Sequence, residues 1–185
     1  MERADRHTHV VLITKRGETK MRFLLTISVL AMATPPLAAH PGEQHAPAAQ
    51  SRTAHISDQA AIRAVLSQYK SAIERLDATG TEKLFTADSA IFETGGVEGS
   101  YLNYLAHHLG PELKEFKSFG FSNYKIDVRL EGPVALATES YNYRIETKKG
   151  EIAERRGVAT SVLKKIGGRW KILSMHNSAR KPKGS

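Results

Sequence analysis

The chain contains no cysteine. This absence excludes disulfide bonds, thiolate metal ligands and a cysteine nucleophile. Beyond residue 33 the sequence also lacks an apolar run of about 20 residues, the length that a membrane-spanning helix needs. With 185 residues in total, the chain has room for one ordinary domain.

Acidic residues are fewer than basic ones, and the formal net charge is +8. Residues 1–39 hold six of the basic and three of the acidic residues, so the remainder carries +5. The basic residues are scattered over predicted turns and ends and are not interleaved with aromatics on one surface. This pattern is typical of a solvated surface, and we predict no nucleic-acid binding.

The N-terminal fifth of the chain has the pattern of a secretory signal peptide. Met21-Arg22 precedes an apolar run over 23–33, two prolines break the run, and small residues at 37–39 offer a cleavage site before His40. Residues 1–39 are therefore predicted to be an extension plus signal peptide, with translation starting at Met1 or Met21. The mature protein would be periplasmic or secreted and without a membrane span; a cytosolic, disordered N-terminus is the alternative.

Residues 40–56 are rich in Ala, Pro, His and Gln and predict a flexible linker. If cleavage follows Ala39, the new N-terminal amine and the His40 imidazole form a separate candidate copper chelate.

Apolar residues at helical spacing begin after this linker. They predict a helix of about five turns over 57–76, with Ser57 as its N-cap. Shorter helices are predicted at 81–85 and 101–109, and one more turn after Gly110-Pro111. These are the only apolar helical faces, and all lie in the first half of the chain.

From Tyr124 onward the apolar period changes to two, which is typical of strands. Turn signals at 131–133, 148–150 and 167–168 separate four long alternating segments and predict an antiparallel meander. A brief strand at 90–92 meets Gly95-Gly96, a hairpin signal. Because one sheet face must be covered, we predict an α+β fold with the helices packed into a strongly curved antiparallel sheet.

Three short motifs are more specific than this pattern: Arg156-Gly157, Gly168-Arg169-Trp170-Lys171-Ile172 and His176-Asn177-Ser178. With the order of the elements, they resemble the nuclear transport factor 2-like superfamily, and within it the SnoaL-like, ketosteroid-isomerase-like group of small bacterial proteins. The resemblance covers residues 57–178 and leaves 179–185 as a basic tail. It implies a cone-shaped, cystatin-like roll, a pocket between sheet and helices, and a homodimer formed through the outer sheet face. It does not assign a reaction, because this fold hosts isomerases, cyclases, dehydratases and assembly modules.

Two histidines are the predicted catalytic residues. Strict alternation places His176 on one strand face with Trp170 and Ile172, so we expect its imidazole to enter the pocket. His108 lies near Tyr101 at the border of the apolar stripe of its helix. The alternative for His176 is a hydrogen bond to backbone at the edge of the core.

Five further residues are the predicted ligand-binding set. If Arg156 points into the cone, its guanidinium group suits a ligand with a carboxylate or a phosphate. The alternative for Arg156 is a structural ion pair with Glu139 or Glu154. Tyr141 shares a face with Glu139 and is a candidate oxyanion donor, provided that this face is the concave one. The set is Arg156, Tyr101, Tyr141, Trp170 and Asp88.

Isomerase chemistry needs a carboxylate base opposite a hydrogen-bond donor. We identify no strand carboxylate with clear core neighbours opposite a tyrosine. The leading hypothesis is therefore an exported domain that binds a small, possibly anionic, organic ligand. The alternatives are a cofactor-independent isomerase, cyclase or dehydratase, and an oligomerisation or interaction module. We predict no cofactor and no metal, with convergence of His108 and His176 on a metal as the alternative.

Overall fold

The computed structural model describes residues 46–182. The predicted signal peptide, the cleavage site, His40 and the last three residues lie outside this range. Within it, no helix combines the length and the apolar character needed to cross a bilayer.

The first helix, α1 (Ala46–Glu74), is longer than predicted. It begins eleven residues before Ser57 and replaces the expected linker over 46–56. The alanines, Gln50 and Arg52 of this stretch have high helix propensity, and a proline is tolerated in a first turn. Ser57 is not an N-cap: its hydroxyl donates to the carbonyl of Ala54 inside the helix.

Six strands form one sheet in the order β2-β1-β6-β5-β4-β3. The predicted meander is confirmed, since neighbouring pairs from β3 to β6 are antiparallel. The first strand, however, runs parallel to the last one, so the sheet is mixed. The strands are β1 (Phe85–Glu93), β2 (Gly96–Gly99), β3 (Phe116–Glu131), β4 (Val134–Thr147), β5 (Ile152–Ile166) and β6 (Arg169–Arg180).

Short helical pieces connect α1 to the sheet and β2 to β3. A 3-10 turn, η1 (Thr81–Leu84), precedes β1. Between β2 and β3, α2 (Tyr101–Tyr104), the π-helical η2 (Leu105–Leu109) and α3 (Gly110–Glu115) follow one another without a break in helical backbone. The Ser100 hydroxyl caps this segment by accepting from the Asn103 amide.

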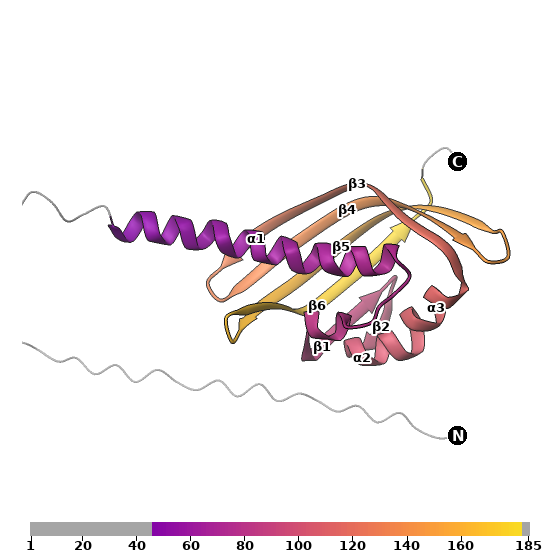
Figure 1. Ribbon diagram of the computed structural model, residues 1–185, viewed down its shortest axis with the longest axis horizontal. Helices are drawn as coiled ribbons and strands as arrows, with labels where there is room; N and C mark the ends of the chain where they lie inside the picture. The colour runs from indigo at the N-terminus through magenta and orange to yellow at the C-terminus, as the bar shows by residue number, and fades with distance from the viewer. Residues whose placement is uncertain (1–45, 183–185) are drawn as a thin grey trace, which may run out of the picture. The chain divides into compact units, whose positions relative to one another are not determined.

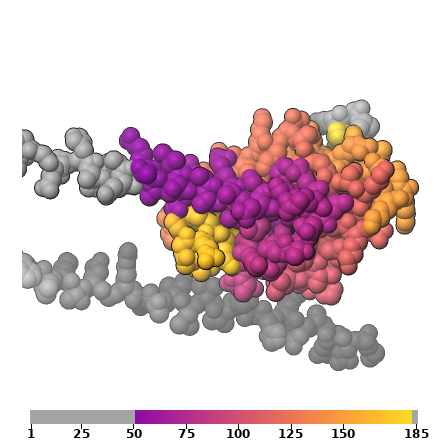
Figure 2. Space-filling view, viewed as in Figure 1, coloured from indigo at the N-terminus to yellow at the C-terminus, as the bar shows by residue number. Residues whose placement is uncertain are grey.

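The sheet curves around the helices, and α1 lies along one of its faces (Figure 1; Figure 2). We call this the inner face and the opposite one the outer face. Asp58 of α1 accepts hydrogen bonds from the Trp170 indole at 2.9 Å and from Lys165 at 2.6 Å. Arg63 donates to a carbonyl of the edge strand β3, at Ile126. These contacts close the cone on its α1 side.

Two β-bulges decide which side chains face inward. Asn123, at a φ of 51°, is an extra residue in β3, and Leu173 is an extra residue in β6. A one-residue insertion moves every following side chain to the other face. Trp170, Ile172 and Met175 are therefore buried, whereas His176 is exposed on the outer face.

Candidate functional site

A cavity of about 160 Å³ lies between the inner face and the helices. We call it the inner cavity. Its walls come from α1, the end of β1, the helical segment before β3, and strands β3, β4 and β6. A smaller, deeper pocket of about 30 Å³ shares Tyr69, Ile73, Phe121, Tyr141 and Asn177 with it.

Aromatic rings form most of the inner wall. Phe121 of β3 and Tyr141 of β4 meet edge to face, with ring centroids 5.0 Å apart. Phe119 stacks on Tyr143 at 5.3 Å. Such rings present flat apolar surfaces suited to a planar ligand. The hydroxyl groups of Tyr69, Tyr141 and Tyr143 have no hydrogen-bond partner within residues 46–182, so they are free to donate into the cavity.

Glu139 lies in the deep pocket with Tyr141. Only 8% of its surface is exposed, and its carboxylate accepts a hydrogen bond from the Tyr124 hydroxyl on the neighbouring strand. Burial raises the pKa of Glu139 above its ordinary value, while the hydrogen bond from Tyr124 acts in the opposite direction. The sequence pattern places Glu139 on one face with Tyr141 but does not identify it as a buried strand carboxylate beside a tyrosine, and the structure shows that it is one. Ala135 and Ala137 precede Glu139 on the inner face of β4. Because both are small, the sequence alone does not indicate that this strand face is part of the core.

Burial also raises the pKa of Tyr141, and the nearby Glu139 charge adds to the shift. The phenol therefore stays protonated and can donate a hydrogen bond. The side-chain amide of Asn177 lines both cavities and is a second donor.

His108 lies among three carboxylates, and two of these, Glu93 and Glu112, line the inner cavity. Its ring nitrogens are 3.3 Å from Glu112, 3.3 Å from Glu98 and 3.8 Å from Glu93. Burial lowers its pKa, but the charges of Glu112 and Glu93 and the hydrogen bond with Glu98 outweigh it, so the pKa is raised. The surrounding carboxylates thus favour the protonated form of the imidazole.

The π-helical turn η2 positions this histidine. A helical wheel with the ordinary period places His108 at the border of the apolar stripe, and the structure agrees, since His108 is partly buried. Gly110 accommodates the wide turn: a Cβ atom there would lie 2.6 Å from the carbonyl oxygen of Leu105.

Three predicted ligand-binding residues have other roles. Tyr101 is 1% exposed, and its hydroxyl lies 2.6 Å from that of Thr81. Trp170 is bonded to Asp58, as described above. Asp88 is exposed on β1 and does not line the inner cavity.

Two other predicted residues lie on the outer face. The expectation that His176 enters the cavity is wrong, because the bulge at Leu173 turns it outward beside Phe92, at 6.3 Å between ring centroids. The signal for this bulge is the adjacent apolar pair Ile172-Leu173, which breaks the alternation. Arg156 is also exposed on the outer face, opposite Asn142 of β4. Of the seven predicted residues, the structure places Tyr141 in the cavity wall and His108 beside two carboxylates of that wall, Glu93 and Glu112.

The inner residue of the Arg156-Gly157 motif is the glycine. A Cβ atom at Gly157 would lie 2.2 Å from the Tyr141 ring, so the ring occupies the space that a side chain would need. As for metals, no three acidic or histidine side chains between residues 46 and 182 form a group able to hold an ion.

The fold and the cavity define a class: a cone-shaped α+β protein whose curved sheet and helices enclose an aromatic, carboxylate-bearing pocket. Residues 62–181 match the family model of the SnoaL-like domain. The chain is a member of the SnoaL-like domain family.

Solved structures share this architecture. A nuclear transport factor 2-like superfamily protein of Salmonella enterica is 18% identical, with a TM-score of 0.61; the match covers 71% of this chain and 96% of that one. A ketosteroid isomerase-like protein of Erwinia carotovora is 20% identical, with a TM-score of 0.58, over 66% of this chain and 96% of that one. A candidate ketosteroid isomerase of Shewanella frigidimarina is 27% identical, with a TM-score of 0.52, over 62% and 91%. No curated protein matches the chain.

Proposed function

We propose that this domain binds a small, uncharged ring compound in the inner cavity. The volume of about 160 Å³ supports this size, because an apolar cavity of about 150 Å³ holds one benzene molecule. The aromatic walls favour a planar ligand, and the hydroxyls of Tyr69, Tyr141 and Tyr143 offer hydrogen bonds to a carbonyl group.

The charges of the cavity argue against an anionic ligand. Glu93 and Glu112 line it, and no lysine or arginine is among the described residues of its wall. In the deep pocket behind it, Lys70 lies with Glu139, but its ammonium group is paired with Glu74 at 2.7 Å. The expected anionic ligand depended on Arg156, which the fold places on the other face of the sheet. An anion in the inner cavity would be repelled by the carboxylates.

A test of binding is calorimetry with neutral cyclic enones and phenols and with their carboxylate analogues. We expect the neutral compounds to bind and Tyr141→Phe to weaken them about tenfold, since it removes one hydrogen bond. His176→Ala, on the outer face, is the control and should bind as the wild type does. Tighter binding of the carboxylates would contradict the proposal. Failure of every compound would favour the interaction-module alternative.

Glu139 favours a second candidate function, a proton-transfer isomerase. A carboxylate with a raised pKa is a stronger base than an exposed one, and Tyr141 shares its pocket as a hydrogen-bond donor. Similarity to the Shewanella and Erwinia proteins, whose names refer to ketosteroid isomerase, also supports this chemistry.

In this reaction, ionised Glu139 removes a proton from the carbon between the carbonyl and the double bond of a β,γ-unsaturated ketone. The electron pair moves onto the carbonyl oxygen, which accepts a hydrogen bond from the Tyr141 hydroxyl. Protonated Glu139 then returns the proton to the γ carbon, which leaves the α,β-unsaturated isomer. No cofactor enters the balance.

The test substrate is a β,γ-unsaturated cyclohexenone, whose single ring matches the cavity. Its conversion is followed by ultraviolet absorbance, and we expect Glu139→Gln and Tyr141→Phe each to lower kcat about a hundredfold or more. Thermal unfolding of each variant checks that it is folded. Undiminished turnover by Glu139→Gln would remove the isomerase candidate.

We also propose that the protein is exported, on the basis of the signal-like pattern over residues 21–39. Mass spectrometry of the protein recovered from the periplasm or medium should show a mature chain that begins at His40. A full-length chain confined to the cytoplasm would contradict export.

A further inference from the structure

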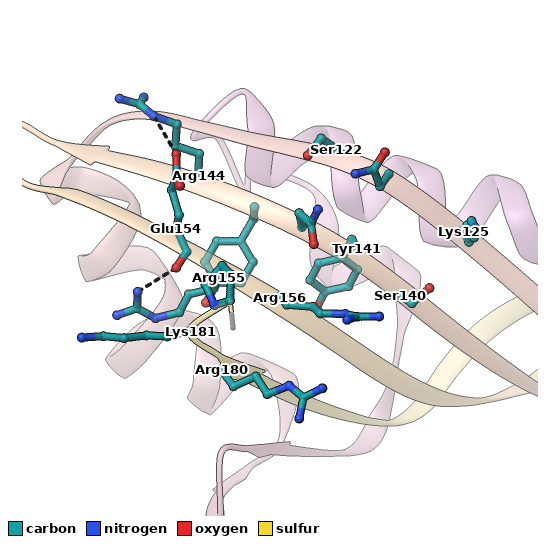
Figure 3. A pocket seen from close by; sticks show the side chains of 14 residues that line it. Ser122, Lys125, Ser140, Tyr141, Arg144, Glu154, Arg155, Arg156, Arg180 and Lys181 are labelled. Carbon is teal, nitrogen blue, oxygen red and sulfur yellow. Dashed lines mark hydrogen bonds and ion pairs between the residues drawn. The ribbon is translucent and has the colours of Figure 1, made fainter. Parts of the chain in front are cut away.

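The outer face of the sheet carries a second hollow, which is unrelated to the inner cavity. It is a groove of about 780 Å³ at the end where β6 finishes, formed by β3, β4, β5 and β6 (Figure 3). We call it the outer groove. Its volume lies within the range of small-molecule sites, about 300–1,000 Å³.

The lining of the outer groove is strongly basic. It includes six cationic side chains and the single carboxylate of Glu154, a formal net charge of +5, whereas the whole chain carries +8. Most of the excess positive charge is therefore gathered at this one place. The six are Lys125, Arg144, Arg155, Arg156, Arg180 and Lys181.

Arg156 and Arg180 form the centre of this charge. They are directly opposite each other on antiparallel β5 and β6, and Figure 3 shows their side chains extending in the same direction. Within residues 46–182 neither guanidinium is in an ion pair or a hydrogen bond. Like charges at directly opposed strand positions are destabilising, so this pair lowers the stability of the free protein.

Glu154 does not neutralise the pair. Its carboxylate lies 3.7 Å from Arg144, and its carbonyl oxygen accepts from Arg155. The guanidinium groups of Arg156 and Arg180 therefore have no counter-charge within residues 46–182 and can bind an external anion. Planar guanidinium forks bind phosphate oxygens with two parallel hydrogen bonds each.

Neutral donors continue the row of arginines across the sheet. Asn142 is opposite Arg156 on β4, and Ser122 is opposite Asn142 on β3. Tyr141, by contrast, turns its ring to the inner face, where it covers Gly157. A nucleic acid would need aromatic platforms for its bases beside the charges, and this row of the sheet presents amide and hydroxyl groups instead.

We propose that the outer groove binds a small organic molecule bearing two or more phosphate groups, with Arg156 and Arg180 holding one of them. This site does not depend on the inner cavity or on the function proposed for it. Its ligand relieves the repulsion between the two arginines, so binding stabilises the folded protein.

Pyrophosphate is the probe. Its binding to the full-length protein is measured by isothermal titration calorimetry and by the shift in the melting temperature of the protein. We expect wild type to bind it and to melt at a higher temperature in its presence. Arg156→Gln and Arg180→Gln should each weaken binding about tenfold, because each removes a charge-assisted contact. Each substitution should also raise the melting temperature of the free protein, because it removes one of the two opposed positive charges.

Arg129→Gln is the matched control: it removes the same charge from the same sheet face, outside the outer groove. It should leave pyrophosphate binding unchanged. Glu139→Gln, in the deep pocket on the inner side of the sheet, should also bind pyrophosphate normally. Equal affinity of wild type and Arg156→Gln for pyrophosphate would overturn the proposal. Binding of an oligonucleotide or of anionic vesicles without binding of pyrophosphate would overturn it as well.

Discussion

Burial and hydrogen bonding set the protonation of the groups around the inner cavity. Glu139 is held among apolar and phenolic side chains, and the Tyr124 hydroxyl is its hydrogen-bond donor. Beside the cavity wall, the carboxylates around His108 raise its pKa. The pKa values of Glu139 and His108 are thus both raised, but for different reasons. Desolvation raises the pKa of the Glu139 carboxyl group, and neighbouring negative charges raise that of the His108 imidazole.

The raised pKa of Glu139 makes stability depend on pH. As pH rises above the ordinary carboxyl value of 4.5, the unfolded chain releases this proton before the folded one does. The contribution of Glu139 to the free energy of unfolding therefore falls with rising pH until the folded pKa is passed. Glu139→Gln removes this fall, so its stability relative to wild type should increase across that window.

Urea unfolding at a series of pH values between about 4 and 8 measures the effect, with linear extrapolation to water. Glu131→Gln, a change of the same kind at an exposed position, is the control. A stability difference between Glu139→Gln and wild type that stays constant with pH would contradict the burial of this carboxyl group.

The hydroxyl of Ser161 is fully buried on β5 and has no hydrogen-bond partner in the described part of the chain. Ser161→Ala removes an unpaired polar group, so we expect the free energy of unfolding to stay the same or to rise by about 1 kcal/mol. Ser89→Ala is the matched control, because the buried Ser89 hydroxyl accepts from the Tyr101 amide at 3.0 Å. The control should lose about 1–2 kcal/mol. Equal losses in both variants, by denaturant titration, would show that Ser161 has a partner.

Among the elements, strands with a constant period could be predicted and strands with an insertion could not. The meander follows from turn glycines and alternating side chains, and the structure confirms it. The bulges at Asn123 and Leu173 reverse the alternation within β3 and β6. Each bulge adds one residue to its strand. A prediction that assumes strict alternation therefore assigns every side chain after the bulge to the wrong face of the sheet.

The contact between β4 and β5 under the Tyr141 ring gives an element-scale prediction. Gly157→Ala places a Cβ atom 2.2 Å from this ring, and we expect a loss of about 1–3 kcal/mol in the free energy of unfolding and a displaced Tyr141. Gly120→Ala on β3 is the control, since a Cβ atom there meets nothing within 4 Å. Thermal unfolding and near-ultraviolet circular dichroism measure both effects. Similar stability of the two variants would show that the ring does not pack on Gly157.

At the scale of the whole molecule, the two hollows differ in charge. Among the described residues, carboxylates line the inner cavity, whereas arginines gather in the outer groove. The two proposed sites therefore offer different charges to a ligand. The outer face also bears Val158, with 51% of its surface exposed, and this apolar group beside the arginine row is a candidate for self-association.

We predict a homodimer that buries Val158 and leaves the arginine row at its rim. Light scattering coupled to size exclusion should give twice the mass of the monomer, and Val158→Lys should shift the mass toward the monomer. Lys171→Gln, a surface change on β6, is expected to leave the mass unchanged. A monomeric wild type at micromolar concentration would contradict this prediction.

The family and the architecture were determined by the sequence itself. Turn glycines, helical and strand periods and the terminal Gly-x-Trp-x-Ile motif are local features, and local features can be read from neighbouring residues. The site was decided by the tertiary structure. Whether Glu139 or His176 faces the cavity depends on bulges, on the curvature of the sheet and on the face that α1 covers. These properties arise from contacts between distant segments, so the order of residues along one strand does not contain them.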